Sequence, residues 1–494
     1  MTINLIIPMA GYGSRFVKSG YKTYKPFLRI SESQNMIMGI CNKFPKKTIK
    51  HFIINDRIKK KYIDILKNIP NSKIIKIKIH KLGPVETILR ATKDLKDLKN
   101  IFVSYCDINW KWNFDDVNLK RNCIYCYKGW HPYTKNNNNY AFCKTKKNNE
   151  LIKIKEKSSF TNKWQNEPLS IGLFYFVDFQ ILIKSFLLLK KKKIKTNNEY
   201  FPSESFNFIK NTKIAYVKQF VHIGSPRYLE EYKNWFFFFK EKKLFINKIK
   251  KTKIADNYLI PAAGEGKRFK NENIFVPKFL IYIKSIKRRS IDYINTFLPN
   301  KKKVLILKYK NYFTKFIDKK KFLLFFLNKK TKGQAFTIYK YLNQANVNGS
   351  FIINSCDVFS LYNIESFLKL KINSDIIIFV SSKSFQDLED HEYTWIENEK
   401  NYLKNIYIKN KPVKNLKILT GNFYFKNKEI FKNCFENSLR NFDKKELYID
   451  DLIKTSLDLN CKVRVMEDDK YINFGTPNLI KDFIFWEKYF KNDR

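Results

Sequence analysis

The chain has 494 residues, of which 44% are hydrophobic and 16% aromatic, so it is too long for one ordinary domain and too apolar to be disordered. Its net charge is +51, from 96 Lys and Arg against 45 Asp and Glu, but only 12 of these basic residues are Arg. A nucleic-acid footprint concentrates charge and favours Arg. The even spread of Lys therefore indicates a compositional bias that fills solvated faces, and no specific nucleic-acid partner is expected.

The sequence also argues against secretion, a membrane span and a metal-stapled fold. The N-terminus has no basic segment ahead of its short apolar run, so no signal peptide is expected. The most apolar long stretch, 171–189, contains an Asp, a Gln and a Lys, which disfavour a membrane span. Cys123 and Cys126 lie near Cys143, but without a second such pair or a His pair they are expected to be strand residues, not zinc ligands. A reduced, cytoplasmic enzyme is predicted.

Strand and helix patterns alternate along the first half of the chain. Strands are predicted at 3–9, 52–55, 74–80 and 101–107, with helices at 36–43, 58–68 and 83–91. Further strands are predicted at 140–143, 151–157, 169–176 and 217–223, with helices at 180–190 and 227–239. This alternation predicts an α/β fold with a mainly parallel central sheet of the doubly wound type.

The same series of landmarks restarts in the second half. The matched pairs are Gly11 and Gly264, Lys25 and Lys278, Gly83 and Gly333, Asp107 and Asp357, Gly172 and Gly421, and Gly224 and Gly475. The separations within these pairs stay between 249 and 253 residues, whereas chance matches would scatter. The sequence therefore predicts a tandem duplication with domains at 1–240 and 254–494, joined by a Lys-rich linker at 241–253.

Each half opens on a glycine turn after an apolar run. Residues 5–16 read LIIPMAGYGSRF, residues 259–269 read LIPAAGEGKRF, and a Lys follows each turn. A Gly-x-Gly turn lets backbone N–H groups face a phosphate. The dinucleotide fingerprint would need a small residue at Phe16 or Phe269, and the Walker pattern Gly-Lys-Ser/Thr is absent. A phosphate loop of another kind is predicted.

Both halves resemble the sugar-phosphate nucleotidyltransferases. The resemblance is carried by 10–15 (AGYGSR) with Lys25, and by 263–268 (AGEGKR) with Lys278. It covers about 1–235 and 256–490 and is nearest to the subgroup of capsule and surface-polysaccharide loci, in which the Gly-Ser-Arg-Phe opening, an internal Gly-x-x-x-Thr and a terminal Gly-Thr-Pro recur. The resemblance implies two tandem Rossmann-like nucleotidyltransferase domains.

The resemblance also implies a role for each matched residue. Catalytic roles fall to Arg15, Lys25, Asp107, Arg268, Lys278 and Asp357. Nucleotide binding falls to Ala10, Gly11, Gly13, Gly83, Thr87, Ala263, Gly264, Gly266, Gly333, Gln334 and Thr337. Binding of the sugar phosphate falls to Glu156, Lys157, Gly172, Glu199, Lys409, Gly421 and Glu446. Asp107 and Asp357 are also the expected Mg²⁺ ligands, because this hard cation favours carboxylate and phosphate oxygens.

Two departures from the family pattern distinguish the halves. Many members carry a second metal-binding Asp two residues before the terminal glycine, where this chain has His222 and Asn473. The Glu of the Glu-Lys pair is replaced in the second half, where Ile408 precedes Lys409. Whether both halves turn over, or one is a binding-only copy, stays open.

The expected reaction transfers a nucleotidyl group from an NTP to a sugar 1-phosphate, or a similar phosphomonoester, with release of pyrophosphate. The product would be a nucleotide-sugar for surface glycan synthesis. Two alternatives remain, namely cytidylyl transfer to a phospho-alcohol such as phosphocholine and a non-catalytic protein that binds nucleotide or sugar. The base, the sugar and the oligomeric state, with a homo-oligomer among the options, stay open.

Overall fold

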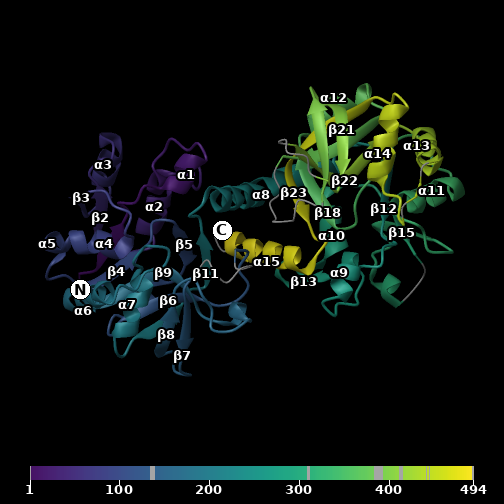
Figure 1. Cartoon of the computed structure of the whole chain (residues 1–494). Helices are drawn as coiled ribbons and strands as arrows, with labels where there is room; N and C mark the ends of the chain where they lie inside the picture. The colour runs from purple at the N-terminus through teal and green to yellow at the C-terminus, as the bar shows by residue number, and fades with distance from the viewer. Residues whose placement is uncertain are drawn as a thin grey trace. The chain divides into compact units, whose positions relative to one another are not determined.

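The computed structural model describes residues 2–133, 140–308, 312–382, 393–410, 416–440, 442–443 and 445–491. The chain divides into two compact units, unit 1 (1–233) and unit 2 (234–492), which can be followed by colour in Figure 1. Helix α8, Pro226–Lys250, spans the division and includes 241–250 of the predicted linker. The helix continues there because the segment contains neither Gly nor Pro, so most of the predicted linker is helical.

The central sheet of unit 1 has the strand order β10-β6-β9-β4-β1-β2-β3. Its strands are β1 Asn4–Pro8, β2 Ile49–Asn55, β3 Ser72–Ile77, β4 Lys99–Ser104, β6 Cys123–Tyr127, β9 Leu169–Asp178 and β10 Lys213–Tyr216. Strand β9 runs antiparallel to β4 and β6, and the other pairings along this order are parallel. The hairpin β7 Phe142–Thr145 and β8 Leu151–Lys155 joins β9, and β5 Ile108–Lys111 pairs with β11 Gln219–His222. The predicted α/β fold with a mainly parallel sheet is confirmed in this unit.

Helices cover both faces of the unit 1 sheet. Its other helices are α1 Ser14–Lys18, α2 Met36–Cys41, α3 Lys60–Lys67, α4 Pro84–Arg90, α5 Thr92–Leu95, α6 Phe179–Lys191 and α7 Pro202–Ser205, with 3-10 helices η1 Lys25–Phe27, η2 Phe114–Asp116, η3 Trp164–Asn166 and η4 Phe206–Phe208. Ile88 of α4 and Phe186 of α6 belong to the core on one face. Phe102 packs against Phe44 and Trp112 on the other. Because both faces are covered, the carboxyl ends of the parallel strands are the natural place for a ligand.

The central sheet of unit 2 repeats this arrangement. Its strands are β12 Asn257–Pro261, β15 Lys303–Leu307, β16 Phe322–Phe326, β17 Phe351–Ile353, β19 Ile376–Ser381, β22 Lys417–Phe425 and β23 Val463–Asn473. The order β16-β15-β12-β17-β22-β19-β23 matches β3-β2-β1-β4-β9-β6-β10 of unit 1 position by position. Strand β22 is antiparallel to both neighbours, as β9 is in unit 1. The two units thus share strand order and strand direction.

Unit 2 differs from the predicted open sheet at one end. Strand β20 Thr394–Glu399 pairs with β22, and β21 Tyr402–Ile408 pairs with both β20 and β23. These pairings close β22, β19, β23, β21 and β20 into a ring. The end strand β23 has 11 residues, whereas its counterpart β10 has 4. Unit 1 makes similar pairings, because β7 pairs with β9 and Glu150 bridges to Lys213 of β10. There β5 pairs with the separate strand β11, whereas β18 Val358–Tyr362 pairs with β23 itself.

The remaining elements of unit 2 cover its sheet on both faces. They are α9 Lys267–Lys270, α10 Ser290–Ile294, α11 Gln334–Gln344, α12 Ile364–Ile372, α13 Lys428–Arg440, α14 Ile449–Asp458, α15 Pro477–Lys491, the short strands β13 Tyr282–Ile283 and β14 Arg288–Arg289, and 3-10 helices η5 Lys278–Leu280, η6 Lys284–Ile286, η7 Asn295–Phe297 and η8 Tyr312–Phe316. Ile338 and Phe435 pack on one face, and Ile249 and Phe367 on the other. Within the described ranges, no helix combines the length and apolar character needed to cross a membrane.

Candidate functional site

The glycine loop of unit 1 connects β1 to α1. Gly13 caps α1 with φ +62°, and no atom lies within 4 Å of the position that a Cβ on Gly11 would take. Tyr24 Oη donates to the Gly11 carbonyl at 3.2 Å, and Asn55 Nδ2 donates to the Ala10 carbonyl at 3.3 Å. The N–H groups of 11–13 form no backbone hydrogen bond with the part of the chain that is described. The loop is thus anchored by its carbonyls, while its N–H groups remain available to an anion.

Lys25 and Asp107 form an ion pair beside this loop. Lys25 begins η1, and Asp107 follows the carboxyl end of β4. Lys25 Nζ lies 2.6 Å from Asp107 Oδ2, and His222 Nε2 lies 3.4 Å from the same oxygen. Burial acts to raise the pKa of Asp107, but the Lys25 charge and His222 outweigh it and hold this pKa far below its ordinary value. Asp107 is therefore a carboxylate at neutral pH.

A second loop of unit 1 contacts the predicted base-binding segment. Gly83 has φ +88°, and a Cβ there would lie 2.8 Å from the Tyr200 carbonyl oxygen. Thr87, in the first turns of α4, has its Oγ1 3.1 Å from His80 Nε2. Gly83 is therefore needed both for its left-handed backbone and for the close approach of the segment around Glu199.

The predicted sugar-phosphate residues meet in unit 1. Ser203 Oγ donates to Glu156 Oε2 at 2.5 Å, and Lys157 Nζ lies 5.0 Å from the centre of the Phe201 ring. Burial raises the pKa of Glu199, against the opposing charge of Lys157 and, after it, of Arg15 and Lys25. Glu199 thus lies within electrostatic reach of Arg15 and Lys25.

Tyr105 and Glu204 belong to the same region and were missed from the sequence. Gly172 has φ +85°, and a Cβ there would lie under 3.0 Å from the Tyr105 ring. Burial raises the pKa of Tyr105 well above its ordinary value, and the charges of Glu156, Asp107, Glu199 and Glu204 add to this shift. Tyr105 therefore lies within electrostatic reach of the predicted metal ligand and of these three glutamates. Its position two residues before Asp107 is the one sequence signal that could have identified it.

Unit 2 repeats the loop and the ion pair. No atom lies within 4 Å of a Cβ built on Gly264 or on Gly266, whose φ is +64°, and Ala263 and Arg268 flank this turn. Lys278 Nζ lies 2.7 Å from Asp357 Oδ2. Burial acts to raise the pKa of Asp357, but the Lys278 charge lowers it below its ordinary value. The ion pair of unit 1 thus has a counterpart of nearly the same length.

The remaining predicted residues of unit 2 also follow the unit 1 pattern. Gly333 has φ +115° and faces the Leu447 backbone, Gln334 begins α11, and Thr337 Oγ1 donates to the Gly333 carbonyl at 3.1 Å. Gly421 has φ +83°, as Gly172 has φ +85°.

The Lys of the predicted Glu-Lys position is held alike in the two units. Lys409 and Lys157 have left-handed φ values of 52° and 51°. Lys409 Nζ lies 4.6 Å from the centre of the Tyr448 ring, and Tyr448 Oη donates to Glu446 at 2.6 Å. Each lysine therefore packs on an aromatic ring two residues after the matched Glu.

The donor atoms at Asp107 and Asp357 are compatible with one common way of holding Mg²⁺. Over the described ranges, no group of three or more His, Cys, Asp and Glu side chains is placed to bind a metal. Asn473, which stands where many members of the resembled family carry a second metal-binding Asp, accepts the Gly475 N–H at 2.6 Å through Oδ1. Mg²⁺ is often bound by one or two carboxylates together with phosphates and water. The residues present fit that mode.

The cysteines are strand residues, as the spacing predicted. Cys126 of β6 and Cys143 of β7 are both buried, with their sulfur atoms 3.8 Å apart. No metal cluster includes them among the residues the structure describes. Both side chains are part of the unit 1 core.

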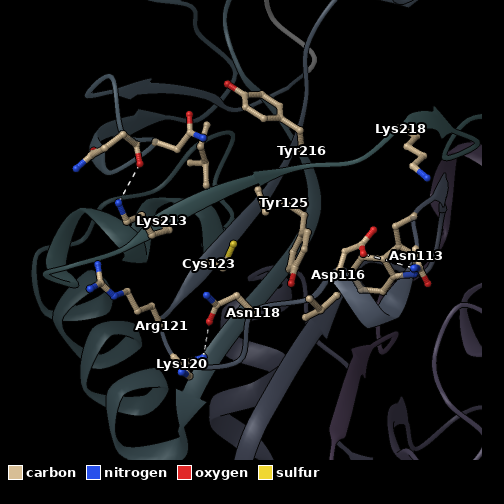
Figure 2. A pocket seen from close by; sticks show the side chains of 16 residues that line it. Asn113, Asp116, Asn118, Lys120, Arg121, Cys123, Tyr125, Lys213, Tyr216 and Lys218 are labelled. Atoms are coloured by element: carbon tan, nitrogen blue, oxygen red, sulfur yellow. Dashed lines mark hydrogen bonds between the residues drawn. The ribbon is translucent and has the colours of Figure 1, made fainter.

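A separate pocket of about 500 Å³ lies against β6 and β10 of unit 1 (Figure 2). Cys123 and Tyr125 of β6 line it, and Lys213 Nζ donates to the Asn148 carbonyl at 2.9 Å (Figure 2). Cys123 is the first residue of β6, whereas Asp107 follows the carboxyl end of β4, which runs in the same direction. None of the predicted site residues lines this pocket, so it is distinct from the candidate site.

The chain matches no protein-family model. It is 25% identical over 330 residues to Protein Ycf2 of Physcomitrium patens, a match that covers 60% of this chain and 13% of that protein. The chain thus spans about an eighth of the length of that relative.

Several solved structures are similar to part of the chain. A nucleoside-diphosphate-sugar pyrophosphorylase from Vibrio cholerae RC9 is 18% identical, with a TM-score of 0.39, and the match covers 46% of this chain and 99% of that one. An inositol-1-phosphate CTP transferase from T. maritima is 15% identical, with a TM-score of 0.37 and coverages of 48% and 96%. A UDP-glucose pyrophosphorylase in complex with UDP-glucose is 15% identical, with a TM-score of 0.38 and coverages of 48% and 99%.

Proposed function

We propose that the chain is a tandem-duplicated nucleotidyltransferase. Each domain would transfer a nucleotidyl group from an NTP to a sugar 1-phosphate, or a similar phosphomonoester, and release pyrophosphate. The product would be a nucleotide-sugar for surface glycan synthesis, as in the capsule subgroup that the loop motifs resemble.

One observation carries this proposal. A carboxylate at a strand end pairs with a lysine beside a Gly-x-Gly-x-Arg loop, at 2.6 Å in unit 1 and 2.7 Å in unit 2. The two units also share strand order and strand direction. The loop, the lysine and the carboxylate are present together in both units although the matched positions 156 and 408 differ, which supports a site for a triphosphate and its metal in each domain.

The proposed chemistry needs positioning and charge neutralisation. An oxygen of the acceptor phosphate attacks the α-phosphorus in line, the bond between the α-phosphorus and the bridging oxygen breaks, and pyrophosphate leaves with that oxygen. The acceptor phosphate is already ionised, so no general base is required. Lys25 and Lys278 would stabilise charge at the α-phosphate, while Arg15 and Arg268 would neutralise the departing pyrophosphate. Mg²⁺ held by Asp107 or Asp357 and by phosphate oxygens would neutralise further charge on the triphosphate.

The test is pyrophosphate release by the full chain, measured across ATP, CTP, GTP, TTP and UTP. Each NTP is combined with a panel of sugar 1-phosphates, inositol 1-phosphate and phosphocholine in the presence of Mg²⁺, and the product is identified by mass spectrometry. Release with a sugar 1-phosphate supports the proposal, whereas release only with phosphocholine would favour cytidylyl transfer to a phospho-alcohol. Nucleotide binding without release from any pair would favour a non-catalytic protein.

A further inference from the structure

Unit 2 lacks the carboxylate that Glu156 provides in unit 1, because Ile408 stands at the matched position before Lys409. A carboxylate is nevertheless present nearby. Ser203, the second residue of α7, lies four positions after Glu199, and Asp450, the second residue of α14, lies four positions after Glu446. Unit 1 thus has a Glu directly after strand β8 and a Ser on the helix, and unit 2 has an Ile at the end of strand β21 and an Asp on the helix.

The contacts indicate that these side chains occupy matching places. In unit 1, Ser203 Oγ donates to Glu156 Oε2, so the helix side chain and the turn side chain touch. In unit 2, Thr394 Oγ1 donates to Asp450 Oδ2. Burial raises the pKa of Asp450, and this hydrogen bond and, as a smaller cause, the charge of Lys409 oppose that rise. The net pKa shift is upward for Asp450, as it is for Glu156, with burial as the largest cause in both. Each unit therefore has one partly buried carboxyl group near the Lys of the matched position.

The hairpin next to this position also differs between the two units. Thr394 pairs with Ile408 across the β20–β21 hairpin, and Thr394 Oγ1 donates to Asp450 Oδ2 at 2.5 Å. In unit 1, Phe142 pairs with Lys155, so the neighbouring Ala141 stands where Thr394 stands in unit 2. A hydroxyl is thus present in each unit to hold the carboxylate, from the helix in unit 1 and from the hairpin in unit 2. Three matched positions of this cluster thus differ together between the two units. This favours a carboxylate that unit 2 has kept at this site over one that it has lost.

We propose that Asp450 is the acceptor-binding carboxylate of unit 2 and replaces Glu156 of unit 1. This inference rests on the proposed function and identifies a specificity-determining residue at the second-substrate site. A carboxylate only accepts hydrogen bonds, so the group that it recognises carries donors, which fits the hydroxyl groups of a sugar ring. Unit 2 accordingly binds its own sugar phosphate. The side chain of Asp450 is shorter than that of Glu156, and it comes from helix α14 instead of from the residue that follows β8. The two units therefore select different hydroxyl arrangements.

The experiment relocates the carboxylate. Four full-length proteins are compared, all carrying Glu156→Gln to weaken the unit 1 subsite: the background alone, Asp450→Ser, Ile408→Glu and the double change Asp450→Ser with Ile408→Glu. The probe is the sugar 1-phosphate that gives the fastest pyrophosphate release, or glucose 1-phosphate if none does. Affinity is measured by saturation-transfer NMR, which needs no turnover, and thermal melting checks that each variant is folded.

Asp450→Ser is expected to weaken binding about tenfold, the effect of losing a hydrogen bond to a charged group. Adding Ile408→Glu should restore affinity to within about threefold of the background, since it rebuilds the Glu and Ser pair of unit 1. If Asp450 had only a structural role, Asp450→Ser would change the melting temperature, and a carboxylate introduced by Ile408→Glu would not restore binding. Unchanged binding in Asp450→Ser, no rescue in a folded double variant, or no saturable binding to the background would each overturn the inference.

These outcomes are separable from those of the proposed function. Pyrophosphate release by the unaltered chain with no effect of Asp450→Ser on sugar phosphate affinity would overturn only the assignment of Asp450. Rescue of binding by the relocated carboxylate in a chain that never releases pyrophosphate would overturn only the enzymatic proposal.

Discussion

Lys25 Nζ lies 2.6 Å from Asp107 Oδ2, and this contact joins the glycine-loop side of unit 1 to the carboxyl end of β4. The side chains of Lys25 and Asp107 are 18% and 11% exposed, so water screens the pair only in part. Each partner stabilises the charge of the other, because the Lys25 charge lowers the pKa of Asp107 and the Asp107 charge raises the pKa of Lys25 against the opposing effect of burial. The pair is therefore a structural unit as well as a candidate catalytic one.

Lys25→Met is expected to destabilise unit 1 by about 2 kcal/mol, because it leaves the Asp107 carboxylate with a weaker partner, His222. Asp107→Asn alone should also destabilise it. The double variant should lose about 1 kcal/mol less than the sum of the single losses, since each single change strands a charge. Urea unfolding measures all three, with the exposed Lys120→Met as the matched control. Strict additivity would show that the two side chains are not coupled.

The glycines at 172 and 421 offer a matched pair for testing close packing. Both have left-handed φ values, +85° and +83°, so alanine costs about 1 kcal/mol of backbone strain at either. A Cβ on Gly172 would also strike the Tyr105 ring, whereas the nearest atom to a Cβ on Gly421 is Ser355 Oγ at 3.6 Å. Gly172→Ala should therefore be about 2 kcal/mol more destabilising than Gly421→Ala in urea unfolding. Equal losses would contradict the packing of Tyr105 on Gly172.

Glu204 should make unit 1 less stable at alkaline pH. Burial, with the charge of Glu156 as the second cause, raises the pKa of Glu204 from 4.5 to about 7. Between these two values the folded state binds a proton that the unfolded state has lost, so stability falls as the pH rises from about 4.5 to 7. Glu204→Gln should remove this loss and raise stability by about 1 kcal/mol at pH 8, after allowance for the partial exposure of Glu204. It should change little at pH 4. Thermal melting at both pH values checks this, and an equal effect at both would contradict the pKa shift.

The features that could be predicted from the sequence are those fixed by short motifs at a constant offset. Lys25 and Asp107 are 82 residues apart, and the prediction that they share a site came from the repeat of both at Lys278 and Asp357. The mainly parallel sheet followed from alternating strands and helices. Local periodicity was sufficient for the sheet, whereas the shared site needed the repeat and the family resemblance.

The features that could not be predicted depend on tertiary partners. Residues 241–250 were predicted to be part of a linker because they are rich in Lys. They are helical, and Ile249 among them is buried in the unit 2 core. The ring of strands in unit 2 requires pairings between β20 and β22 that no local pattern encodes. Asp450 could not be identified as a site residue from the sequence, because its hydrogen-bond partner, Thr394, is 56 residues away. Only the folded arrangement brings such residues together.

The central claim is that the duplicated lysine and carboxylate act in nucleotidyl transfer. The most direct test is the rate of pyrophosphate release by Lys25→Ala, Lys278→Ala and the double variant, using the NTP and acceptor that give the highest rate. Lys120→Ala with Lys369→Ala, at exposed positions in the two units, is the matched control. The double variant is expected to lose at least about 100-fold in rate while the control does not, and the single variants should reveal the share of each unit. A folded double variant that releases pyrophosphate at the unaltered rate would contradict the account.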